Sequence, residues 1–273
     1  MPYLARTEPC EVLRRDGLAS VLWLEDAIAN YNVPTVVFQL HLLVSNPNDA
    51  AKSLRLAGWT DVETNAQIGL FDVNFHDIQC IYLDPPTMEE EHETTPGLPP
   101  PVRKGPPPVR KGPPPATRTV LLSAQDCNAP IEPLLSGNPP QCDTIPPLWF
   151  LVDGLISGVL DAPAESRLEE RLALQLVYLY GHCHEMRSPK LIEQLRLENR
   201  QFHIDALTGP SVGKAPLIAW NRRIRRQLQD GTRQLMYENS LLSTNPPEYQ
   251  QFISQLHSDF RELQPSTLLS SKD

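Results

Sequence analysis

The chain has 273 residues, of which 40% are hydrophobic and 21% charged, so it can bury a core without disulfides or a structural metal. Its formal net charge of −9 disfavours nucleic acid as a partner, because phosphate contacts need concentrated Lys and Arg. No Cys-x-x-Cys spacing occurs, which excludes the common zinc and redox motifs; the five cysteines are Cys10, Cys80, Cys127, Cys142 and Cys183.

The sequence shows no targeting or membrane pattern. The N-terminal residues have no apolar stretch after a basic start, so we expect no secretory signal. No run approaches the roughly 18 apolar residues that a membrane span requires. An odd, scattered set of cysteines fits a reducing compartment. We therefore expect a soluble, cytoplasmic protein without a membrane partner.

The first third of the chain predicts a helix followed by a strand. Apolar side chains recur at helical spacing over residues 18–28, and Pro34 then favours an extended backbone just before it. Residues 36–44 read Val-Val-Phe-Gln-Leu-His-Leu-Leu-Val, a composition that suits a pleated surface. Gln39 and His41 lie two positions apart, so we expect both to project from one face of this strand.

The next predicted element is a helix with clear signals at both ends. Asn46 is placed to cap its N-terminus, and Pro47 occupies the first helical position. Gly58 follows the last apolar residue of the helical pattern, where a left-handed residue commonly ends a helix. This strand and helix form the strongest local prediction in the sequence.

The middle of the chain alternates between predicted strands and proline-rich segments. Strand patterns occur within residues 68–83 and again at 118–123. Between them, the sequence Pro-Pro-Pro-Val-Arg-Lys-Gly occurs twice in tandem, and such a segment cannot build a core. We therefore predict a disordered insertion over 86–117. A further Pro-, Gly- and Asn-rich stretch predicts a loop over 128–147.

The second half of the chain is predicted to be helical. Leucines at helical spacing indicate a long helix up to about Cys183, and Pro189 begins another that reaches about residue 207. A basic helix is expected over 215–230. A last helix is expected over about 247–263, followed by a frayed tail.

Residues 24–59 resemble the small-molecule nucleotidyltransferases of the aminoglycoside type. In that family a helix precedes a strand carrying Asp-x-Asp, and a capped helix ending in Gly-aromatic follows; here the helix ends in Ala-Gly58-Trp59. The layout, with its Arg-rich helical second half, is also similar to a group of fungal proteins that share this fold. The resemblance implies a nucleotidyltransferase-like unit at the start of the chain.

These patterns predict an α+β fold in five parts. A small nucleotidyltransferase-like mixed sheet with helices is followed by a helical C-terminal half. The predicted boundaries are 1–85 and 118–127 for the α/β unit, 86–117 for the disordered insertion, 128–147 for the loop, 148–264 for the helical domain and 265–273 for a flexible tail.

The residues at the family's metal-binding positions differ from the pattern. The two strand carboxylates of the family hold a divalent metal that bridges the nucleotide phosphates, and they correspond here to Gln39 and His41. Neither side chain supplies the anionic oxygen that Mg²⁺ prefers. A Gly-Ser pair that would hold phosphate is replaced by Glu25 and Asp26. We therefore predict a non-catalytic protein without cofactor or metal, which acts by binding a ligand or a protein.

Two alternative functions remain open at this point. The first is a divalent-metal-dependent nucleotidyltransferase acting on a small molecule, for example in fungal secondary metabolism, with Mg²⁺ held by relocated acids. Candidates for those acids are Asp61, Glu63, Asp72 and Asp84. The second is an adaptor that recruits a protein partner through the proline-rich residues 96–116 or through residues 246–249.

Two motifs carry the candidate binding residues. The basic helix predicts an anion site or a solvated, ion-paired face, with Arg222, Arg223, Arg225 and Arg226 as the candidates. Pro246, Pro247 and Tyr249 belong to Pro-Pro-x-Tyr, a pattern that WW domains bind. The simpler interpretation of this second motif is that the prolines begin a helix and Tyr249 packs inward.

Overall fold

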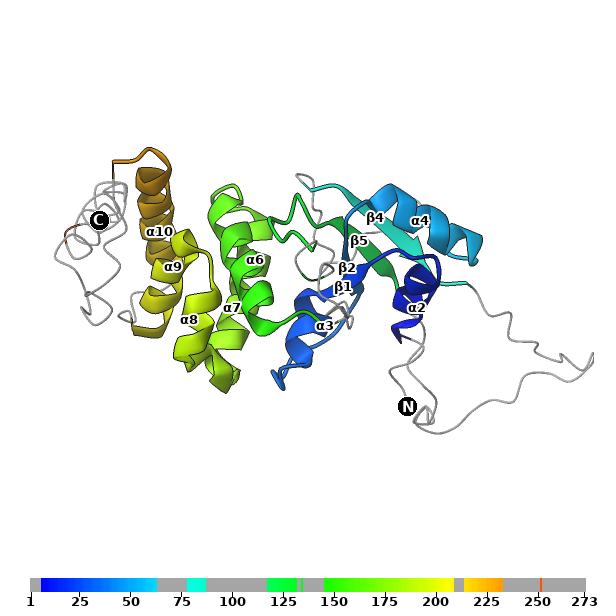
Figure 1. The fold of residues 1–273 in the computed structure, drawn as a ribbon, viewed down its shortest axis with the longest axis horizontal. Coiled ribbons are helices and arrows are strands. Elements are labelled where there is room, and N and C mark those ends of the chain that lie inside the picture. Colours follow the sequence, from blue (N-terminus) through cyan, green and yellow to red (C-terminus); the bar gives the residue numbers. More distant parts are fainter. Residues whose placement is uncertain are drawn as a thin grey trace, which may run out of the picture.

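The computed structural model describes residues 6–62, 78–86, 117–131, 134, 145–208, 214–232 and 251. Over these residues the fold is α+β, as the sequence predicts, with a five-stranded mixed sheet followed by a helical half (Figure 1). The sheet and the helical half lie side by side along the longest axis, with α9 and α10 farthest from the sheet (Figure 1). No described helix has the length and apolar content to cross a membrane.

The sheet has the strand order β1-β2-β5-β4-β3. Its strands are β1 (Ser20–Trp23), β2 (Leu40–Val44), β3 (Thr60–Asp61), β4 (Cys80–Asp84) and β5 (Thr119–Ser123). The central strands β2 and β5 pair in parallel, and every other neighbouring pair is antiparallel. Every residue of β2 and β5 is buried, which explains why both read as nearly continuous apolar runs.

Three helices belong to the sheet half: α2 (Glu8–Arg15), α3 (Leu24–Ala29) and α4 (Pro47–Leu56). Helices α2 and α4 contact one another, and α4 also contacts β4 and β5. Helix α3 contacts β1 and β2 and also reaches α7 of the helical half. Through α3, the N-terminal elements are packed against residues more than a hundred positions later in the chain.

The predicted ends of α4 are confirmed. The Asn46 side-chain oxygen accepts the backbone N–H of Asn48 at 2.9 Å, so it caps the helix that Pro47 begins. Gly58 has φ of 100° directly after the C-cap, a conformation that favours glycine because it has no Cβ.

Two other predictions in this half are partly wrong. The helix expected over 18–28 begins only at Leu24, because Ser20–Trp23 pairs with β2 as a strand. Leu24 has φ of 52° where the chain turns from β1 into α3. The strand expected over 36–44 begins only at Leu40, because its ladder with β5 starts at Leu40 and its ladder with β1 starts at His41. Local periodicity does not contain the distant partner that decides both elements.

The helical half contains α6 (Leu148–Asp161), α7 (Arg167–His182), α8 (Pro189–Gln194), α9 (Leu197–Thr208) and α10 (Lys214–Gln229), with a 3₁₀ turn at His184–Arg187. The prediction of one helix over 189–207 is wrong in one respect, because these residues form two helices, α8 and α9. They separate at Leu195 and Arg196, where the Arg196 N–H donates to Asp153 Oδ1 of α6 at 2.8 Å. A tertiary hydrogen bond replaces the helical one at this position.

Some predicted segments lie outside the described residues. These are most of the strand region 68–83, nearly all of the insertion 86–117, much of the loop 128–147, most of the final helix 247–263 and the tail 265–273.

Helix α6 approaches the sheet closely through a glycine. A Cβ built at Gly154 would lie 2.6 Å from Cη2 of the buried Trp23 ring and 3.0 Å from Cβ of Ala129. Neither neighbour can move without displacing packed core, so the small residue is what lets α6 lie against β1.

We expect Gly154→Ala to lower the free energy of unfolding by about 1–3 kcal/mol, because overpacking at Trp23 outweighs the helix propensity of alanine. The matched control is Gly181→Ala in α7, where nothing lies within 4 Å of the added Cβ. That control should be neutral or stabilising by up to about 1 kcal/mol. Urea denaturation of both variants measures the difference, and equal effects would contradict this account of α6.

Candidate functional site

His41, one of the two residues that the resemblance aligns with metal ligands, lies inside the sheet. It lies in β2, the second strand of the sheet, opposite Trp23 of β1 and Val120 of β5, and it is 3% exposed. Its Nδ1 lies 3.4 Å from Oε2 of Glu25 in α3. His41 therefore lies next to Glu25. The resemblance aligns Glu25 and Asp26 with a Gly-Ser pair that would hold phosphate.

Glu25 is held by residues from α7 as well. Its side chain is 3% exposed, and its Oε1 accepts hydrogen bonds from Arg171 and, at 3.2 Å, from Nε2 of Gln175. Burial lowers the pKa of Arg171, yet an arginine stays charged because its ordinary pKa lies above 12. The carboxylate of Glu25 is thus neutralised by a cation of the same chain.

The carboxylate of Asp26 is also paired with an arginine. Arg6 donates from Nε and Nη2 to its two oxygens at 2.7 and 2.8 Å, a bidentate pair. The same guanidinium donates to the backbone oxygen of Gln39 at 2.8 Å and to Oγ1 of Thr117 at 2.7 Å. Arg6 therefore ties the chain ahead of α2 to α3 and to the residues that precede β2 and β5.

We call these residues the buried charge cluster; its members are Arg6, Glu25, Asp26, His41, Arg171 and Gln175. Each of its two carboxylates binds an arginine of the chain, so its charges balance internally. Within the described part of the chain, no group of three His, Cys, Asp or Glu side chains is arranged to hold a metal ion. The cluster can fix elements in place. Its one carboxylate oxygen without a hydrogen bond, Oε2 of Glu25, is buried beside Nδ1 of His41.

His41 is neutral in this environment. Burial lowers the pKa of His41 to about 3, and the positive charge of Arg6 acts in the same direction. A hydrogen bond with the Gln39 backbone opposes the shift and is outweighed. The 3.4 Å contact with Glu25 therefore joins a carboxylate to a neutral imidazole, since Arg171 already balances that carboxylate.

Breaking the cluster should be costly. We expect Glu25→Gln to lower the free energy of unfolding by about 3–5 kcal/mol at neutral pH, because it leaves Arg171 charged and without its anion in a buried place. The matched control is Asp61→Asn, which breaks the exposed pair that Asp61 makes with Arg55 and should cost less than about 1 kcal/mol. Denaturant unfolding at one pH measures both. Similar losses of stability in the two variants would contradict a buried ion pair between Glu25 and Arg171 that depends on both charges.

Acid should destabilise the fold through His41. Its pKa is about 3 when folded and 6.5 when unfolded, so between these values the unfolded chain binds the extra proton. The contribution of neutral His41 to the free energy of unfolding is fully present above pH 6.5. It decreases as the pH falls, and about 2 kcal/mol of it is lost near pH 5. His41→Gln, which cannot titrate, should show a shallower fall between pH 7.5 and about pH 5. Parallel curves for the two proteins would contradict a neutral buried His41.

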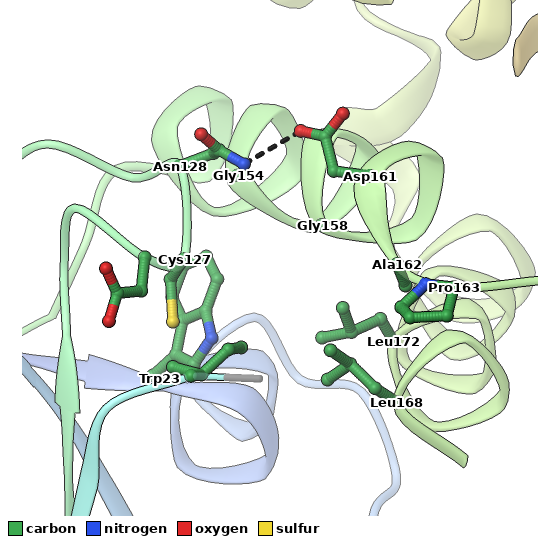
Figure 2. A pocket seen from close by; sticks show the side chains of 12 residues that line it. Trp23, Cys127, Asn128, Gly154, Gly158, Asp161, Ala162, Pro163, Leu168 and Leu172 are labelled. Atoms are coloured by element: carbon green, nitrogen blue, oxygen red, sulfur yellow. Dashed lines mark hydrogen bonds between the residues drawn. The ribbon is translucent and has the colours of Figure 1, made fainter. Parts of the chain in front are cut away.

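A small pocket is lined by Trp23, by the loop after β5 and by the helices α6 and α7 (Figure 2). Its volume is about 100 Å³, below the roughly 300–1,000 Å³ of typical ligand pockets. Asn128 donates to Asp161 at 2.7 Å across its edge (Figure 2). Burial raises the pKa of the lining Cys127 to about 12, so this thiol is protonated and is no nucleophile. The pocket admits a few atoms and carries no evident chemistry.

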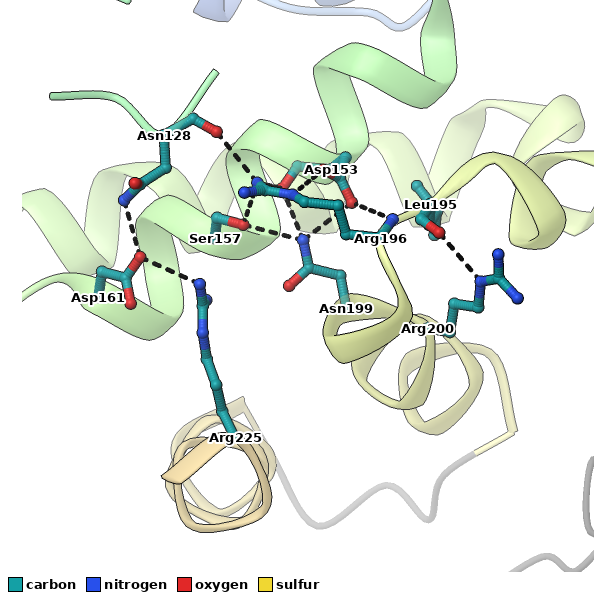
Figure 3. Close-up of polar contacts among 9 residues, drawn as sticks. All are labelled: Asn128, Asp153, Ser157, Asp161, Leu195, Arg196, Asn199, Arg200 and Arg225. Atoms are coloured by element: carbon teal, nitrogen blue, oxygen red, sulfur yellow. Dashed lines mark hydrogen bonds and ion pairs between the residues drawn. The ribbon is translucent and has the colours of Figure 1, made fainter. Parts of the chain in front are cut away.

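Two of the four candidate arginines of α10 face α6. Arg222 donates to the backbone oxygens of Leu160, Val159 and Ala162 at the end of α6, and it pairs with Glu169 at 2.7 Å. It thereby satisfies carbonyls that the helix leaves without partners. Arg225 pairs with Asp161 at 3.3 Å (Figure 3).

The other two arginines, Arg223 and Arg226, are exposed. The four predicted anion ligands therefore do not converge on one site. Arg222 and Arg225 serve internal contacts, and Arg223 and Arg226 lie on the solvent side of the same helix.

A polar network that the sequence analysis missed joins α6 to α9 (Figure 3). Asn199 donates to Asp153 Oδ1 at 2.9 Å and to Ser157 Oγ at 2.8 Å, and Arg196 binds both of these residues as well as the Asn128 oxygen. A usable signal was present, because Asp153 and Ser157 stand four residues apart in an otherwise apolar helix.

The remaining candidates divide between described and undescribed residues. Asp61 pairs with Arg55 and Asp84 with Arg118, both at the edge of the sheet formed by β3 and β4. The other relocated acids and the partner motifs lie outside the described residues; these are Glu63, Asp72, residues 96–116, Pro246, Pro247 and Tyr249.

The chain was compared with protein-family models, curated proteins and solved structures, and no match was found in any of the three comparisons.

Proposed function

We propose that this protein is non-catalytic, has a nucleotidyltransferase-like scaffold, and acts by binding a ligand or a protein. The observation that carries the proposal is the buried charge cluster. Arg6 binds the carboxylate of Asp26, and Arg171 binds that of Glu25. Both pairs lie next to β2, the strand that the resemblance aligns with the metal-binding strand of the family.

The energetics of the cluster argue against a metal at this place. A divalent cation would have to displace an arginine from Glu25 or Asp26, and that arginine would then be buried beside a second cation. Gln39 and His41 add no negative charge to hold the metal, and the low pKa of His41 reflects how strongly this environment disfavours further positive charge. The same residues are well suited to hold α3, β2 and α7 together.

Binding is then expected at the surface of the molecule, away from the cluster. The partner segments that the sequence predicts, 96–116 and 246–249, remain the candidates for a protein partner. The exposed Arg223 and Arg226 remain candidates for contact with an acidic group, through α10.

A transferase with relocated acids is the competing proposal. The accessibility of Asp61 and Asp84 favours it, although the register places Thr60 directly opposite Asp84 and so directs the two carboxylates to opposite faces of the sheet. Both carboxylates are partly exposed, with side chains 61% and 43% accessible, so a metal could reach them more easily than Glu25.

The test is a thermal-shift titration with ATP, CTP, GTP and UTP, each with and without Mg²⁺ or Mn²⁺. We expect no metal-dependent rise in Tm for any nucleotide, because the metal has no anionic ligands at β2. A site filled at a hundredfold excess over Kd would add about 2.7 kcal/mol, hence a rise of at least about 5 °C.

The variant Asp61→Asn/Asp84→Asn separates the two proposals. A metal-dependent rise in Tm that this double variant abolishes would overturn the non-catalytic proposal and support the transferase. A metal-dependent rise in Tm that persists in the double variant would also overturn the non-catalytic proposal. It would indicate a metal site elsewhere, with Gln39 and His41 as the next residues to substitute.

A further inference from the structure

The pocket beside Trp23 has an apolar interior. Leu168 and Leu172 of α7 line it together with Ala162 at the end of α6 and the Trp23 ring (Figure 2). Helix α6 also lines it with Gly158, where an added Cβ would lie 2.7 Å from Cδ1 of Leu172. Because these surfaces are apolar, the interior suits the hydrocarbon part of a small molecule.

The indole N–H of Trp23 faces this apolar interior. Trp23 is 2% exposed, and its Nε1 points into the pocket, on the side of Leu168 and Leu172 (Figure 2). Among the residues that the structure describes, Nε1 has no hydrogen-bond acceptor. The N–H of a tryptophan can only donate, and when buried it usually has a partner. A molecule bound in the pocket would supply the acceptor.

The volume of the pocket limits the size of such a molecule. An apolar cavity of about 150 Å³ accommodates benzene, which has six heavy atoms. The pocket beside Trp23 has a volume of about 100 Å³. In proportion, it accommodates about four heavy atoms. So small a ligand makes few contacts, and we therefore expect a Kd in roughly the millimolar range.

The charges at the edge of the pocket limit the chemistry of the ligand. The charged side chains among its described lining residues are Asp126 and Asp161, and both are exposed. Arg225 pairs with Asp161 at 3.3 Å but does not itself line the pocket. An anion would therefore be repelled by charge of the same sign. An ammonium group has no lone pair to accept the N–H of Trp23. The combination favours a neutral ligand with an acceptor oxygen.

We propose that the pocket binds a small neutral oxygen compound, such as a short-chain ketone, alcohol or amide. Its oxygen accepts the hydrogen bond from Nε1 of Trp23, and its alkyl groups pack on Leu168 and Leu172. None of the lining residues belongs to the buried charge cluster. The inference therefore goes beyond the proposed function and holds whether or not the fold is catalytic.

The experiment is an NMR titration of the ¹⁵N-labelled full chain with acetone, followed through the indole N–H signals. The chain has four tryptophans, Trp23, Trp59, Trp149 and Trp220, and the signal that Trp23→Phe removes is that of Trp23. We expect acetone to shift this signal to a plateau while the other three move little. Acetate has the same shape but is an anion, so it should bind at least about tenfold more weakly.

A pair of variants places the binding in the pocket. Ala162→Leu adds carbons to the pocket lining and should weaken acetone binding at least about tenfold, because the space is filled. The matched control is Ala164→Leu, at an exposed residue two positions later that does not line the pocket, and it should retain the wild-type affinity. Unchanged indole signals of Trp149 and Trp220 show that each variant is folded.

Three results would overturn the proposal. The first is a Trp23 signal that acetone leaves in place, or that moves in proportion to concentration together with the other indole signals, as a solvent effect would cause. The second is binding of acetone that Ala162→Leu does not weaken. The third is acetate binding as tightly as acetone, and this comparison needs only the wild-type chain, so it decides even where Ala162→Leu does not fold.

Discussion

The ion pair between Glu25 and Arg171 connects the two halves of the molecule. Glu25 lies in α3, directly after β1, and Arg171 lies in α7, 146 residues later. Both side chains are largely removed from water, so each charge needs the other to remain buried. Gln175 and His41 complete the surroundings of the carboxylate. This requirement helps to hold α7 against α3, beside the hydrophobic core that the two halves share.

The same charges define what the site near β2 can do. In a metal-dependent transferase, carboxylates at this place would be turned toward a cation and phosphates. Here Arg6 and Arg171 bind the nearby carboxylates, and His41 is neutral because burial lowers its pKa. In our proposal, this internal neutralisation takes the place of a ligand site. This is why we propose that the scaffold binds partners through other surfaces and does not catalyse.

Helix α6 organises the second half by presenting different residues on different sides. Gly154 lets it lie against Trp23 of the sheet, and Asp153 with Ser157 forms the polar network that fixes α9. Its last carbonyls are satisfied by Arg222 of α10. Polar groups inside the helical half are therefore paired across helices, which restricts how the helices can pack.

Sequence patterns alone predict the α+β class, the strand β5 and the ends of α4. The two ends are local features, because the Asn46 side chain caps a backbone N–H two residues later and Gly58 takes a left-handed backbone conformation. It also marked Gln39 and His41 as lacking the negative charge of metal ligands. Tertiary structure alone decided that residues 20–23 are a strand, that the chain breaks between α8 and α9, and that Arg6 and Arg171 neutralise Asp26 and Glu25. The physical reason is that strand pairing and ion pairing join residues far apart in the chain, and local periodicity contains no information about such partners.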